Sequence, residues 1–136
     1  MADLGKNQGR LSIVVHAGAF DRVHYALMMA AAAAAVDRPV TLFFTMGATQ
    51  ALRRPDGWVN LSGAEWDDHL KERNIADFET LLLSCAAMDV GFMVCEAGLK
   101  AEDMSAEDLR DDIAIEVSGL VTFFGQTEAE GQTLFV

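Results

Sequence analysis

Cys95, His16 and Thr45 are the residues of this sequence that could carry chemistry and that also lie where apolar runs end. Cys95 closes the run that begins at residue 90, and His16 follows the run 11–15. A thiolate is a nucleophile, and an imidazole exchanges a proton near neutral pH. The sequence therefore indicates thiol chemistry at Cys95, with His16 as a secondary candidate that could orient or deprotonate the thiol.

Each of these two residues also has a structural interpretation. Backbone N–H groups of a turn at Ala97 and Gly98 would favour the thiolate of Cys95, whereas the neighbouring charge of Glu96 would disfavour it. An unpaired cysteine is also commonly a small buried hydrophobe. His16 could simply hydrogen-bond a backbone carbonyl at the end of a strand.

The second cysteine, Cys85, lies on the apolar stripe of an expected helix and is predicted to be a core residue. That helix must run antiparallel to the strands, so Cys85 is expected about 17 Å from Cys95, whereas a disulfide needs Cα atoms within about 7 Å. We therefore expect no disulfide between them. The three histidines are dispersed and the glycines match no nucleotide-binding fingerprint, so neither a metal nor a cofactor is expected.

Apolar runs alternate with amphipathic segments along the chain, which predicts strands alternating with helices. The expected strands are 11–16, 40–46, 90–95, 113–117 and 132–136. Asp21 is expected to cap a helix 22–36, and Asn74 with Asp77 resembles the start of a helix 75–88. Ser105 with Asp108 marks a further helix start, and the last helix is expected over 118–128. Residues 54–74, which hold both tryptophans, are expected to form an irregular excursion, a lid or an oligomer contact.

Strands without in/out alternation are typical of a parallel sheet covered by helices on both faces. The 136 residues, 51% of them hydrophobic, suit one compact domain. We expect a polar N-terminal lead over residues 1–10 and the α/β domain over residues 11–136. No second domain or internal repeat is visible.

Charge and hydropathy exclude several partners. Ten basic residues against 21 acidic ones leave a net charge of −11, concentrated in the second half of the chain, which disfavours nucleic-acid binding. No apolar run reaches the roughly 20 residues that a membrane span requires. The start of the chain lacks the apolar stretch of a signal peptide, so a cytoplasmic location is expected.

The segment 81–99, LLLSCAAMDVGFMVCEAGL, followed by IAIEVSGLVTFF over 113–124, resembles the DsrE/DsrF-like family of small sulfur-relay proteins. In that family a cysteine ends the third strand, and a later strand leads into a Gly-x-x-x-Phe helix, matched here by Gly119 and Phe123. The resemblance covers most of the chain. Here Met88-Asp89-Val90 replaces the usual Leu-Gly-Val before the third strand, and Asp also tolerates a left-handed conformation.

The resemblance implies a three-layer α/β/α domain with a five-stranded parallel sheet, assembled as a homo-oligomer, a trimer or hexamer. It also implies that Cys95 accepts sulfane sulfur as a persulfide and passes it on, as a possible sulfurtransferase. The partners would be sulfur donor and acceptor proteins or small persulfides. Two alternatives stay open: a non-catalytic oligomeric module that binds a small ligand at the strand ends, and a single-cysteine redox sensor or reductase.

Overall fold

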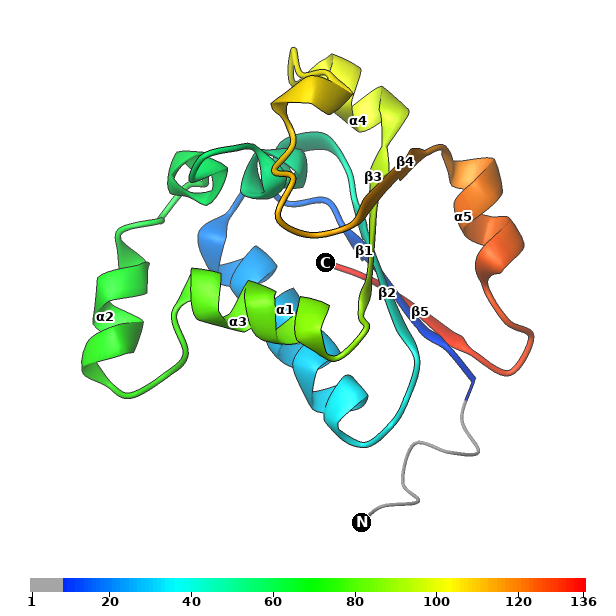
Figure 1. Cartoon of the computed structure of the whole chain (residues 1–136), viewed down its shortest axis with the longest axis horizontal. Coiled ribbons are helices and arrows are strands. Elements are labelled where there is room, and N and C mark those ends of the chain that lie inside the picture. The colour runs from blue at the N-terminus through cyan, green and yellow to red at the C-terminus, as the bar shows by residue number, and fades with distance from the viewer. Residues whose placement is uncertain (1–8) are drawn as a thin grey trace.

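The computed structural model describes residues 9–136 and contains one five-stranded sheet, all parallel, in the order β4-β3-β2-β1-β5 (Figure 1). The strands are β1 Leu11–Val15, β2 Val40–Phe44, β3 Gly91–Cys95, β4 Ile115–Ser118 and β5 Gln132–Phe135. Helices lie on both faces, so the predicted three-layer, single-domain α/β architecture is confirmed.

The three central strands follow from their composition. Every residue of β1 and β2 is buried, as are four of the five residues of β3, which is why these segments are apolar without alternation. The edge strands β4 and β5 are partly or fully exposed. Strand β4 begins two residues later than predicted and ends one residue later, so that it includes Ser118.

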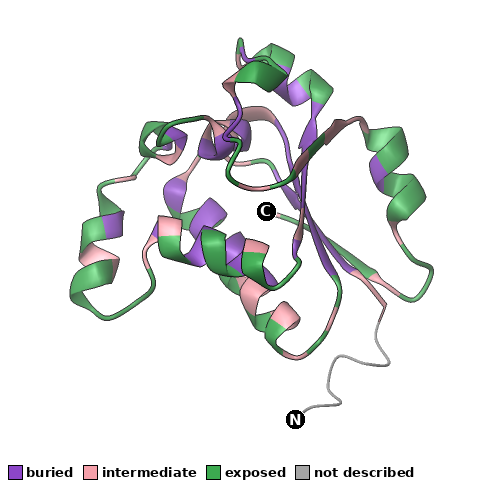
Figure 2. Ribbon diagram, in the orientation of Figure 1, coloured by how far each residue is buried: buried purple, intermediate pink, exposed green. Residues whose placement is uncertain are grey.

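The two faces of the sheet are covered unequally. Helices α1 (Phe20–Ala35) and α3 (Phe78–Ala87) pack on one face, and within the described residues only α5 (Leu120–Gln126) lies on the other (Figure 1). Figure 2 shows that α1 and α3 present buried residues to the sheet, whereas α5 is mostly exposed. Phe123 is the one buried residue of α5.

The remaining elements lie in the connections. A 3-10 helix η1 (Met46–Leu52) follows β2, and a short helix α4 (Glu96–Ala101) follows β3. Within the predicted excursion the structure has a 3-10 turn η2 (Gly57–Asn60) and a helix α2 (Trp66–Glu72). A single 3-10 turn η3 (Ala106–Asp108) precedes β4.

Several predicted helix starts were wrong by a few residues. Ala19, not Asp21, is the N-cap of α1, and Asp21 lies within its first turn. Asp77, not Asn74, caps α3 by accepting a hydrogen bond of 2.8 Å from the N–H of Thr80. Hydrogen bonding by Thr80, first through its side chain and then through this backbone N–H, lowers the pKa of Asp77.

The helices predicted from Ser105 and Ser118 are shorter than expected. Ser105 and Asp108 do form a capping box, but it starts only a single 3-10 turn. The backbone becomes extended at Leu109, directly after that turn. There Arg53 and Leu109 form an isolated antiparallel bridge, so pairing with another segment competes with helix extension. The last helix begins at Leu120 rather than at residue 118, because Ser118 pairs in the sheet.

The excursion that holds the two tryptophans belongs to the α1/α3 side. Trp58 stacks on Phe78, with ring centroids 5.4 Å apart, and also contacts Phe20. Trp66 is largely exposed and stacks on His69. The buried part of this segment thus completes the main core.

None of the helices within residues 9–136 is long and apolar enough to cross a membrane. The predicted polar lead, residues 1–10, falls mostly outside the described residues, of which only Gly9 and Arg10 belong to it.

Candidate functional site

The carboxyl edge of the sheet brings Cys95 into one row with three polar side chains. The parallel register pairs Cys95 with Ser118 on β4. Extending the pairs Phe44 with Val94 and Val15 with Phe44 by one residue puts Thr45 beside Cys95 and His16 beside Thr45. Side chains alternate between the two faces along a strand, so all four residues lie on the α5 face. Each lies two residues beyond a buried apolar residue of that face or beside such a residue on the neighbouring strand.

Cys95 itself is a free and mostly covered thiol. Its exposed fraction is 5%, and it packs in a small cluster with Val14, Phe43, Met93 and Phe123. Phe123 of α5 packs against Phe43 with tilted rings whose centroids are 4.5 Å apart, which fixes α5 over this part of the sheet. Access to the sulfur therefore depends on α5, a short helix that buries one side chain.

Helix α4 begins immediately after Cys95, which is its N-cap residue, without a hydrogen bond from the cap side chain. The helix can lie this close because Gly98 has no side chain. A Cβ at Gly98 would be 2.5 Å from the backbone nitrogen of Met46 and 2.9 Å from Oγ1 of Thr45. The β3–α4 turn thus rests directly on the backbone that follows β2, and only glycine permits that contact.

A second close approach holds the neighbouring loops. A Cβ at Gly47 would lie 2.9 Å from the Cα of Gly18, so the loops after β1 and β2 also touch backbone to backbone. Strand β1 is anchored next to these loops, because the N–H of His16 donates to the carbonyl of Val136. The row of polar residues is therefore set by contacts of the main chain.

His16 and Cys95 are not direct neighbours, because β2 lies between β1 and β3. Two strand spacings correspond to about 10 Å between their backbones. The exposed imidazole of His16 lies beside Phe135, with ring centroids 5.3 Å apart. The structure thus places His16 in the same row as the thiol, but one residue removed from it.

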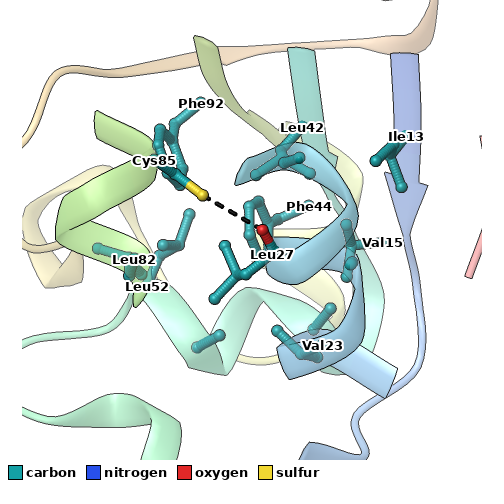
Figure 3. Close-up of a cluster of buried hydrophobic side chains, with 14 of the residues drawn as sticks. Ile13, Val15, Val23, Leu27, Leu42, Phe44, Leu52, Leu82, Cys85 and Phe92 are labelled. Carbon is teal, nitrogen blue, oxygen red and sulfur yellow. Dashed lines mark hydrogen bonds between the residues drawn. The ribbon is translucent and has the colours of Figure 1, made fainter. Parts of the chain in front are cut away.

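Cys85 lies on the opposite face, deep in the main core, as predicted. Its side chain is fully buried among apolar residues of α1, α3 and the sheet, and its Sγ donates a 3.4 Å hydrogen bond to the carbonyl of Leu27 (Figure 3). Burial raises the pKa of the Cys85 thiol to about 11. Cys85 is therefore protonated and covered at neutral pH, and both cysteines are free.

Ser118 is a residue of this row that the sequence pattern did not single out. The predicted strand ended at Val117, which assigned Ser118 to the following helix. In the structure its Oγ is buried and finds no hydrogen-bond partner among residues 9–136. The only available signal was the polar residue between the apolar strand and Gly119, and that signal also suits a helix start.

Other candidate sites lie away from the thiol. A cavity of about 600 Å³ occurs on the α5 face at the amino ends of the strands, where Arg10, Thr41 and Glu116 contribute to its lining. The Arg10 guanidinium there donates a 3.1 Å hydrogen bond to Oγ1 of Thr41. Within the described chain, no group of three or more His, Cys, Asp or Glu side chains is placed to hold a metal ion.

A parallel five-stranded sheet between helices, with a thiol at the carboxyl end of its third strand, defines a class of small α/β proteins. The profile of the DsrE/DsrF-like family matches residues 10–133. The chain therefore belongs to the DsrE/DsrF-like family.

Solved structures agree with this assignment at the level of the fold. A protein of unknown function, MTH1491 from Methanobacterium thermoautotrophicum, is similar with a TM-score of 0.62 at 15% identity, over 94% of this chain and 99% of that one. The ychN protein from E. coli is similar with a TM-score of 0.60 at 18% identity, over 95% and 99% of the two chains. A search of curated proteins found no match.

Proposed function

We propose that this protein is an intracellular sulfur-relay protein in which Cys95 carries sulfane sulfur as a persulfide. The observation that carries the proposal is the position of Cys95, a free thiol at the end of β3, in a chain that belongs to the DsrE/DsrF-like family. The notable feature of this position is that the sulfur lies at the carboxyl edge, where ligands of open α/β sheets bind.

The transfer step needs no oxidant. The Cys95 thiolate attacks the terminal sulfur of a donor persulfide, R–S–SH, and forms a new S–S bond. The donor's S–S bond breaks, its electron pair leaves on R–S⁻, and the proton stays on the terminal sulfur. An acceptor thiolate then repeats the same exchange on the Cys95 persulfide and releases the Cys95 thiolate.

The position of Cys95 favours donor and acceptor approaching from the α5 side of the sheet rather than from the side of the main core. The exposed fraction of Cys95 is 5%, and α5, the one helix over it within residues 9–136, buries a single side chain, Phe123. In a persulfide the transferable sulfur lies about 2 Å further out than Sγ, the length of an S–S bond. A small outward movement of α5 would therefore expose it to a donor or an acceptor.

In the proposed relay His16 acts as a secondary residue. In the row of polar residues, Thr45 separates His16 from Cys95. At that position the imidazole could exchange a proton through a water molecule or with the bound persulfide. The partners would be donor and acceptor proteins or small persulfides, and the net charge of −11 favours proteins with a basic face.

We also propose that the relay protein is a homo-oligomer, a trimer or hexamer. Support comes from an apolar surface on the α5 face, here named the α5/β5 patch. It consists of the exposed side chains Leu120, Val121, Phe124 and Phe135. Apolar surface gathered in this way is costly to leave in water and marks a protein contact.

The test is intact-mass spectrometry after incubation with a small sulfane-sulfur donor such as glutathione persulfide. We expect the wild-type chain to gain the mass of one sulfur atom. Cys95→Ser should abolish this gain, whereas Cys85→Ala, the matched control, should retain it because the Cys85 thiol is buried and protonated.

Other outcomes identify the alternatives. A gain of one oxygen atom with dilute peroxide, trapped by dimedone and without any sulfur gain, would contradict the relay and favour a redox sensor. Alkylation of Cys95 no faster than that of free glutathione, again with no sulfur gain, would favour the ligand-binding module. Sulfur gain on Cys85 alone would contradict the proposal outright.

A further inference from the structure

Ser118 and Cys95 are direct neighbours across two hydrogen-bonded strands. The register pairs their Cα atoms, and paired residues of adjacent strands lie about 4.8 Å apart with their side chains on the same face. Ile115 and Val117 of β4 pack against the main core, so Glu116 and Ser118 point to the other face. The hydrogen bond from Gln126 of α5 to Glu116 confirms this orientation.

The hydroxyl of Ser118 is buried without a partner. Its Oγ is covered, and no residue of the described chain accepts or donates a hydrogen bond there. A buried hydroxyl without a partner costs free energy, so native proteins satisfy nearly all such groups. The Ser118 hydroxyl is such an exception, and it lies beside Cys95. A hydrogen bond that forms only when the thiol is in its reactive form would give this hydroxyl a partner.

Cys95 lies where such a partner could act. The side chains around it in the small cluster are apolar, so none of them can donate a hydrogen bond to its sulfur. The titratable side chains on the elements around it are Glu96 and Lys100 on α4 and Glu116 on β4, with His16 at the end of β1, and all four are exposed. Within residues 9–136, none of the charged side chains on these elements is buried.

We propose that the Ser118 hydroxyl rotates to donate a hydrogen bond to the thiolate of Cys95, and that Ser118 is thus a positioning and stabilising residue for the sulfur site. This inference rests on the proposed function only in taking Cys95 as the reactive thiol. The Oγ of Ser118 makes no hydrogen bond in the described structure, so the donation requires a change of the Ser118 χ1 rotamer that brings Oγ to the sulfur once the thiol loses its proton. A hydrogen bond to the charged form favours that form.

The experiment measures the rate of Cys95 alkylation by iodoacetamide against pH, in a Cys85→Ala background that leaves one thiol. We expect Ser118→Ala to move the midpoint of this profile upward by about one pH unit, and to slow alkylation about tenfold on the acidic side of the midpoint. Ser118→Thr keeps the hydroxyl in a residue that suits a strand, and its midpoint should stay with the parent.

Ser12→Ala is the matched control. Ser12 is buried on the same face of the sheet, but at the amino end of β1, away from Cys95. Its removal should leave the midpoint unchanged. Urea unfolding is measured in parallel, and Ser118→Ala should be as stable as the parent or more stable, since the folded thiol form leaves this hydroxyl unpaired.

Two results would overturn the inference: a profile of Ser118→Ala that superimposes on the parent, or an equal shift in Ser118→Thr. These results are independent of sulfur transfer. If the midpoint shifts but no persulfide forms, Ser118 stabilises the thiolate and the relay is wrong. If persulfide forms and the midpoint does not shift, the relay holds and the role of Ser118 is wrong.

Discussion

At the scale of single residues, the two cysteines show how position decides chemistry. Both are buried, but Cys85 lies at the centre of the main core, and Cys95 lies at the edge of a small cluster under one short helix. The thiol of Cys85 already has a hydrogen-bond acceptor in the carbonyl of Leu27. Its environment stabilises the protonated form, which makes it a structural residue.

Gly98 is the residue that holds the chain after Cys95 in place. We predict that Gly98→Ala lowers the free energy of unfolding by about 1–3 kcal/mol, since overpacking against a backbone cannot be relieved by a rotamer change. The added Cβ would meet the nitrogen of Met46 at 2.5 Å. Equilibrium unfolding in urea measures the effect.

The control for Gly98→Ala is Gly125→Ala in α5. A Cβ at Gly125 meets nothing within 4 Å, so alanine should be neutral or slightly stabilising there. Equal stability of the two variants would show that the contact between α4 and the loop after β2 is not tight.

At the scale of elements, the chain between α4 and β4 is long and depends on one arginine. Arg110 is buried and donates from Nη1 and Nη2 to Glu79 of α3, at 2.6 and 2.9 Å, and from Nε and Nη2 to Asp112, both at 2.7 Å. Its backbone N–H donates to the carbonyl of Leu52 at the end of η1. One residue thereby joins three segments that are distant in sequence.

We predict that Arg110→Met lowers the free energy of unfolding at neutral pH by about 1–3 kcal/mol, the range for hydrogen bonds to charged groups. Glu79 and Asp112 are partly exposed, so their charges are not stranded in the core. Arg54→Met is the control, because within the described chain the Arg54 side chain makes a single, exposed ion pair, 3.9 Å from Asp111. A surface pair of this kind contributes about 0–1 kcal/mol.

The contribution of Arg110 should also depend on pH. Its hydrogen bonds lower the pKa of Asp112, so the native state binds this proton less readily than the unfolded chain. The stabilisation is then present above the ordinary aspartate value of about 3.9 and is lost as pH falls through the lowered pKa. The stability difference between wild type and Arg110→Met should narrow below about pH 4, and a constant difference would contradict this assignment.

At the scale of the whole molecule, the two faces of the sheet are covered unequally, and we expect this difference to govern the proposed assembly. The α1/α3 face is closed by two helices and the tryptophan segment, whereas the α5/β5 patch remains exposed, with exposed fractions of 90% for Val121, 57% for Phe124 and 72% for Phe135. A second copy that covers this patch would also limit how far α5 can move from Cys95. Assembly and access to the sulfur are therefore expected to be coupled.

We predict that Val121→Asp combined with Phe124→Ser raises the dissociation constant of the homo-oligomer at least about tenfold, because both substitutions introduce polar groups into an apolar contact. Sedimentation velocity across a dilution series measures the shift. Val59→Asp is the control, since Val59 is exposed to about the same extent as Phe124 but lies on η2, away from the patch. An oligomer that resists the double substitution would show that subunits meet elsewhere.

The sequence alone was sufficient for the strands, their parallel arrangement, the two helices of the main core, the burial of Cys85 and the family. These features depend on the periodicity of apolar residues, which is a property of short local segments of the sequence. The position of the tryptophan-bearing excursion 54–74, the short length of η3 and the start of α5 depended on tertiary contacts. Pairing in the sheet or with another loop competes with local helix signals. The neighbours of Cys95 were also decided only by the tertiary structure. Register and strand order place Ser118 beside the thiol and separate His16 from it by one residue. Neither register nor strand order can be read from a local sequence pattern.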